Sequence, residues 1–95
     1  MTVEELRTEL EKVTLSLTDS GFDSVDSGVM EKLVKFAAIA NELDMKEGKR
    51  LIENLLETIK AIQAGKSTAD SGNVRLTALD FYLKKHSEDG AIEDL

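Results

Sequence analysis

Apolar residues recur at intervals of three and four along the first part of the chain. The first set consists of Val3, Leu6, Leu10, Val13 and Leu17. This spacing places the whole set on one side of a helix. Thr2 can cap the start of that helix, and Glu4 and Glu5 fall in its first turn, where the helix dipole favours negative charge. The pattern therefore predicts an amphipathic helix over residues 2–17.

The same periodicity predicts two further helices, at 27–43 and 45–64. The apolar side of the first of these carries Val29, Leu33, Phe36, Ala40 and Leu43, and it is widened by Met30, Val34, Ala37 and Ile39. The apolar side of the second carries Leu51, Ile52, Leu55, Leu56, Ile59 and Ile62. We expect Asp26 or Ser27 to cap the first, and Asp44 to form a capping box with Glu47 at the start of the second. Gly65 is expected to end that helix.

A fourth helix is predicted over residues 72–86, and its first two residues overlap the end of a polar loop segment at 66–73. Its apolar and aromatic residues are Val74, Leu76, Leu79, Phe81, Tyr82 and Leu83. The acidic segment 89–95 is expected to be a flexible tail, so that residues 1–88 form one helical domain. Four amphipathic helices with short connections most simply form a bundle. The expected fold class is therefore all-α, a small four-helix bundle.

The composition agrees with helices and limits the chemistry. The 95 residues include no proline, tryptophan or cysteine, and His86 is the only histidine. The chain can therefore form neither a disulfide nor a His-paired metal site. No apolar run approaches the roughly 20 residues that cross a membrane, and the first residues lack the pattern of a signal peptide. We expect a cytoplasmic, non-enzymatic protein that requires no metal or cofactor.

The charge distribution bears on the partners. The net charge of −7 disfavours nucleic acids and anionic membranes. Residues 46–66 differ, because five basic and three acidic side chains give this segment a charge of +2. The wide apolar side of the 27–43 helix exceeds what one bundle buries, so we expect a second copy or another protein to cover the excess. The residues assigned to this contact are Met30, Val34, Lys46, Lys49 and Arg50.

These observations favour a small acidic interaction module, an adaptor or a regulator, that binds another protein or forms a homodimer. One alternative rests on residues 17–25, LTDSGFDSV, which resemble the signature of acyl and peptidyl carrier proteins. In that family a serine in a Gly-x-Asp-Ser-apolar segment carries phosphopantetheine, so the resemblance implies Ser24 as the attachment point. The residues themselves also fit a plain connector, in which aspartate and serine turn the chain and cap the next helix.

A second alternative rests on residues 39–45 and the basic residues after them, which resemble a helix-turn-helix motif. The resemblance implies a DNA-binding regulator whose recognition helix begins with Lys46, Lys49 and Arg50. Asp44 occupies the turn position that usually holds glycine. The net negative charge of the chain opposes this function.

Overall fold

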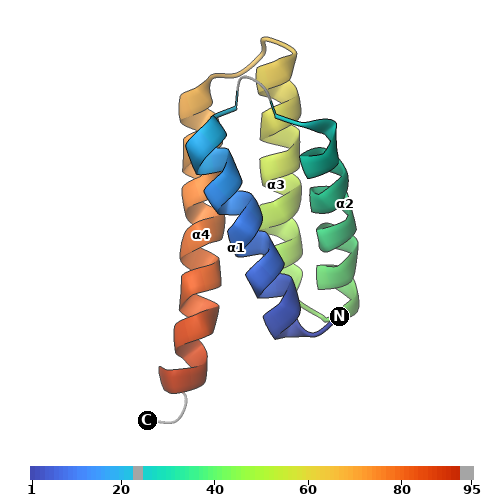
Figure 1. The fold of residues 1–95 in the computed structure, drawn as a ribbon, viewed down its shortest axis with the longest axis vertical. Coiled ribbons are helices and arrows are strands. Elements are labelled where there is room, and N and C mark those ends of the chain that lie inside the picture. The colour runs from blue at the N-terminus through green and yellow to red at the C-terminus, as the bar shows by residue number, and fades with distance from the viewer. Residues whose placement is uncertain (23–24, 93–95) are drawn as a thin grey trace.

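The computed structural model describes residues 1–22 and 25–92, and it describes side chains as far as Lys85. The four helices are α1 (Val3–Ser20), α2 (Ser27–Glu42), α3 (Lys46–Gln63) and α4 (Ala69–Ile92). Successive helices run in opposite directions, and α1 packs against both α2 and α4, which closes the bundle (Figure 1). The predicted all-α four-helix bundle is confirmed.

The core is built from the inner side of each helix. Its fully buried side chains are Leu6, Leu10, Leu33, Ile52, Leu55, Ile59, Leu79 and Leu83. Partly buried residues such as Val29, Met30 and Leu51 pack around this cluster. The predicted apolar sides of the first three helices therefore face the core, except that Val3 on α1 and Val34 on α2 are exposed.

Two helix starts have the caps that the sequence indicated. The Thr2 hydroxyl accepts a hydrogen bond from the Glu5 N–H at 3.1 Å, and the Glu5 carboxylate accepts one from the Thr2 N–H at 3.0 Å. The two bonds form a capping box. The bond that the carboxylate accepts from the Thr2 N–H lowers the pKa of the Glu5 carboxyl because it stabilises the charged form. At α2, the Asp26 carboxylate accepts a hydrogen bond from the Gly28 N–H at 3.1 Å.

The start of α3 differs from the expected capping box. Asp44 adopts a φ of 60°, a left-handed conformation, and no side chain caps α3 at its N-cap residue, Met45. The left-handed turn directs the Met45 N–H to the Ala40 carbonyl at 2.8 Å and leaves the Met45 side chain buried. Glu47 pairs with Arg50 instead of the helix start. The prediction was wrong because Asp44 is part of the tight turn before α3, so that Met45 occupies the N-cap position instead.

The start of α4 also differs, because the last five of the eight residues in the predicted loop 66–73 are helical. α4 begins at Ala69, and the Ser71 and Gly72 N–H groups donate to the Thr68 carbonyl at 3.1 and 3.3 Å. Gly72 lies on the buried side of this first turn, where Ile62 and Phe22 pack over it. Tertiary packing thus overrides the turn preference of the Asp-Ser-Gly-Asn segment.

The predicted end of α3 is confirmed, whereas the far end of α4 extends beyond its expected bound. Gly65 follows α3 with a φ of 74°, and the next residue, Lys66, donates its N–H to the Ala61 carbonyl at 2.8 Å. At the other end, α4 continues to Ile92 and so includes most of the segment 89–95 that was expected to be a tail. The remaining residues of that segment, 93–95, lie outside the described residues.

Candidate interaction surface

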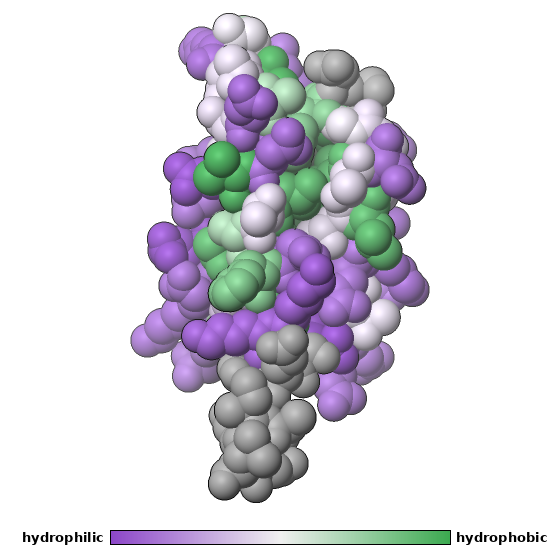
Figure 2. All heavy atoms as spheres, turned by 90° about the vertical axis from the view of Figure 1, so that its left-hand side faces the viewer, coloured by the Kyte–Doolittle hydropathy of each residue, from purple (hydrophilic) through white to green (hydrophobic). Residues whose placement is uncertain are grey.

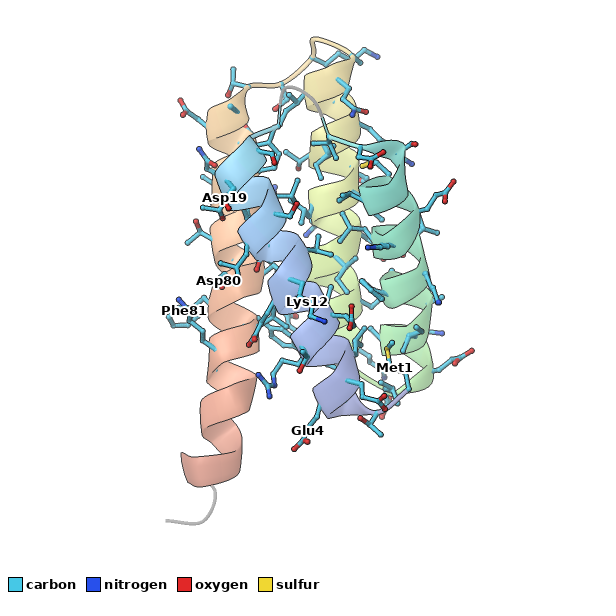
Figure 3. All side chains as sticks on the ribbon, in the orientation of Figure 1. Met1, Glu4, Lys12, Asp19, Asp80 and Phe81 are labelled. Carbon is cyan, nitrogen blue, oxygen red and sulfur yellow. The ribbon has the colours of Figure 1, made fainter. Side chains whose placement is uncertain are left out.

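Helix α4 carries apolar side chains on two opposite sides. Leu79 and Leu83 face the core and are fully buried, whereas Val74 and Phe81 are 65% and 70% exposed. Because each residue turns a helix by about 100°, Val74, Ala78 and Phe81 share the side opposite Leu79. We call these three residues the outer stripe. Figure 3 shows the Phe81 side chain pointing away from the bundle.

The outer stripe forms one wall of an open groove between α3 and α4, with a volume of about 590 Å³. The α3 wall consists of Glu47, Arg50 and Leu51, and Thr77, Tyr82 and Lys85 complete the α4 wall. We call this the α3–α4 groove. Figure 2 views the α4 side of the molecule and shows apolar atoms on this face among polar side chains. An apolar surface framed by charge in this way is typical of a contact with another macromolecule.

A contact between Tyr82 and Gly48 holds the two walls of the groove together. Gly48 is buried, and a Cβ atom added there would lie 3.1 Å from the Tyr82 hydroxyl oxygen. Only glycine allows the ring to approach this part of α3 without displacement. Burial raises the pKa of the Tyr82 phenol, and a backbone hydrogen bond with Gly48 partly opposes the rise.

This pKa can be measured directly, because Tyr82 is the only tyrosine and the chain has no tryptophan. We expect the phenolate absorbance of the folded protein to titrate with a midpoint above 10.0, the ordinary value for tyrosine. The folded state holds this proton more tightly than the unfolded chain does. Its contribution to stability is therefore complete below the unfolded pKa and is lost as the pH rises through the folded pKa. In denaturant the midpoint should return to the ordinary value, and a folded midpoint at or below it would contradict the burial.

An ion pair lies at the edge of the groove on α3. The Arg50 Nε donates to a Glu47 carboxylate oxygen at 3.2 Å, and a second guanidinium nitrogen donates to the other oxygen. Arg50 lowers the pKa of the Glu47 carboxyl, and Glu47 raises the pKa of Arg50, because each stabilises the charge of the other. Both side chains are exposed, so the pair contributes little to stability.

Three of the five residues predicted to contact a partner meet in a different groove, between α2 and α3. This α2–α3 groove has a volume of about 540 Å³ and is lined in part by Val34, Lys49 and Arg50. Val34 is 55% exposed. The other two predicted residues do not line it: Met30 is half-buried against the core, and Lys46 is exposed at the first position of α3.

The predicted attachment point, Ser24, lies outside the described residues. On its two sides, Phe22 is buried in the core and Asp26 caps α2. Both described flanks of the stretch thus have roles in folding, and phosphopantetheine on Ser24 stays a prediction. Among the side chains that the structure describes, up to Lys85, no group of three or more aspartate or glutamate side chains could hold a metal ion.

The basic residues assigned to DNA lie on a helix pair with a different geometry from the resembled motif. Helix-turn-helix motifs join two helices at about 90–120°. Here α2 and α3 lie antiparallel and side by side (Figure 1). Lys46, Lys49 and Arg50 are therefore on a helix packed along its predecessor, and DNA binding through them stays a prediction.

The outer stripe is the feature that the sequence analysis missed. Val74 and Phe81 were grouped with the leucines of the same helix as apolar residues of one set. Their spacing carried the signal, because steps of four and three through Ala78 define a second side of the helix. Residues on that side cannot pack into the core that Leu79 and Leu83 enter.

Comparisons with protein-family models, with curated proteins and with solved structures found no match to this chain. In the described part of the chain, every helix is too short or too polar to cross a membrane. The structure thus defines the class of the protein, a small all-α bundle of four antiparallel helices. Two of its exposed large apolar side chains, Val74 and Phe81, belong to the outer stripe on α4.

Proposed function

We propose that the protein is a small, non-enzymatic interaction module of the cytoplasm that binds a protein partner through the α3–α4 groove. The observation that carries this proposal is the exposure of Phe81, at 70%, beside the exposed Val74. Burying a fully exposed side chain of this kind contributes roughly 1.5–3 kcal/mol. Two such side chains on one helix face therefore offer a partner substantial binding energy.

The local chemistry favours this groove over the α2–α3 groove. Aromatic residues that enter a pocket of the partner commonly dominate binding energy, and Phe81 is an exposed aromatic residue held on a rigid helix. The α2–α3 groove offers the smaller Val34, and five charged residues line it, against three in the α3–α4 groove. Desolvating those charges would oppose binding.

The proposal is tested with three variants that place the same charge on different exposed apolar positions. Phe81→Glu disrupts the α3–α4 groove, Val34→Glu disrupts the α2–α3 groove, and Leu15→Glu changes α1, where Leu15 is 67% exposed. Each tagged variant is used to retain proteins from extracts of cells that make the chain, and the retained proteins are quantified. We expect Phe81→Glu to lose at least one protein, or the untagged chain itself, that wild type and Leu15→Glu retain.

The variants also define the results that would contradict the proposal. Exposed positions tolerate substitution within about 0.5 kcal/mol, so circular dichroism should show all three variants folded. Retention that survives Phe81→Glu, or that is lost only in Val34→Glu, would show that the α3–α4 groove is not the binding surface.

A further inference from the structure

We infer that the partner of the outer stripe is a second copy of this chain, with the two α4 helices antiparallel across a two-fold axis. This inference rests on the proposed function, because it names the occupant of the surface described there. It arises from the order of residues along the exposed side of α4. When a second copy of this helix runs antiparallel to the first, the exposed residues of the two copies are complementary in size and charge.

The complementarity is centred between Thr77 and Ala78. An antiparallel pair with this centre places residues of the two copies at the same level when their numbers sum to 155. Val74 of each copy is then level with Phe81 of the other, twice by symmetry. Because a helix rises about 1.5 Å per residue, the two Val–Phe levels lie about 10 Å apart. Each Val74 side chain thus meets the larger Phe81 side chain of the other copy.

The charges at the two ends of the stripe follow the same symmetry. Asp70 lies four residues before Val74, and Lys85 lies four residues after Phe81, so both share the exposed side of the helix. Their numbers also sum to 155, which places each Asp70 level with the Lys85 of the other copy. Within the described residues, neither side chain has an ion pair of its own. A reversed second copy supplies each with a partner of opposite charge.

The centre of the stripe allows the two helices to approach. Thr77 and Ala78 are small, and short side chains permit closely packed helix axes. The contact of Gly48 with Tyr82 shows which residues of α3 lie beside which residues of α4. One turn along α3 from Gly48, Leu51 comes level with Ala78 because the helices are antiparallel. Leu51 lines the groove there and widens the apolar centre.

The affinity of such a dimer is limited by its size and by charge. One helix face from each copy buries an area near the lower end of specific interfaces, below about 1,200 Å². The copies also repel each other through their net charge of −7. At physiological salt the Debye length is about 8 Å, so this long-range repulsion is largely screened while the close pairs still act. We therefore expect a reversible dimer with a Kd in the micromolar range or above.

Charge exchange tests the arrangement on the full chain. Sedimentation equilibrium from about 5 to 500 µM should show the wild-type mass rising from 10.4 kDa toward twice that value. Asp70→Lys alone and Lys85→Asp alone each place like charges at both ends of the dimer. Each should weaken self-association about tenfold, since two exposed pairs are reversed.

Restoration is the decisive result. In an equimolar mixture of the Asp70→Lys and Lys85→Asp chains, a dimer of unlike copies has opposite charges facing each other at both ends of the stripe. The mixture should therefore regain the wild-type Kd. The double variant should regain it as a homodimer. The matched control is Glu31→Lys on the exposed side of α2, which should leave the Kd unchanged.

Several results would overturn the inference. These are a monomeric mass at every concentration, a dimer that both single changes leave intact, and single changes that neither the mixture nor the double variant restores. The proposed function can fail separately. A monomer that still loses a different protein through Phe81→Glu would remove the dimer and leave the proposed function in place. A dimer that persists in Phe81→Glu would overturn the inference, and it would contradict the proposed function as well only if every other retained protein also survived this change.

Discussion

Replacing Leu79 with alanine is expected to lower the free energy of unfolding by about 2–5 kcal/mol. Leu79 is fully buried on the inner side of α4, among the leucines and isoleucines of the core. The change removes apolar contacts and leaves a cavity that the surrounding helices can only partly fill. A domain of this size is stable by roughly 5–15 kcal/mol in total, so one such change removes a large share of it. Urea denaturation followed by circular dichroism measures the loss.

The matched control is Leu15→Ala, which deletes the same atoms from a side chain that is 67% exposed. Its effect should lie within about 0.5 kcal/mol of zero. Equal losses in the two variants would contradict the assignment of Leu79 to the core.

Replacing Gly72 with leucine is expected to destabilise the fold by about 3 kcal/mol, at the upper end of the cost of overpacking. A Cβ atom at this position would lie 2.9 Å from the Ile62 Cδ1 atom and 2.9 Å from two atoms of the Phe22 ring. The added side chain must therefore displace both residues. Leucine favours a helix over glycine by up to about 1 kcal/mol, so the observed loss reports the packing conflict in excess of that gain.

Ser71→Leu is the control for Gly72→Leu, because Ser71 is the adjacent residue on α4 and is exposed. It should keep or slightly raise the thermal midpoint. If Gly72→Leu were also neutral, the first turn of α4 would not pack against Phe22 and Ile62.

The fold could be predicted as far as local patterns determine it. The cap at Thr2 and the cap at Asp26, one of the two residues expected to cap α2, depend on residues within three positions of each other, and the structure has both. The start of α4 was misread because the decisive contacts come from distant parts of the chain. Gly72 appeared as a turn residue in sequence, and its proximity to Phe22 is a property of the assembled bundle.

Asp44 shows a related limit. An aspartate three residues before a glutamate fits a capping box as well as a turn, and the sequence offered no means to choose between them. In the structure Asp44 takes the left-handed conformation of the turn and the side chain of the next residue, Met45, is buried. The capping-box pattern of Asp44 and Glu47 is present in the sequence, but the structure has the turn with Met45 buried in place of the box.

The candidate surface was predicted only in outline. The expectation that an apolar helix face remains for a partner rested on α2, where Val34 is exposed but Met30 is half-buried against the core. The larger exposed face belongs to α4, where the angular positions of Val74 and Phe81 separate them from the buried leucines. Periodicity identifies two faces on such a helix, and only the packing of the neighbours shows which one enters the core.

The position of Tyr82 gives the protein a built-in optical reporter. Its ring lies in the wall of the α3–α4 groove, and its phenol is the only source of tyrosine emission in a chain without tryptophan. Any molecule that covers the groove changes the polarity around that ring. Fluorescence of the unlabelled chain can therefore follow occupancy of the groove in real time, without a dye or a tag that would alter the surface under study.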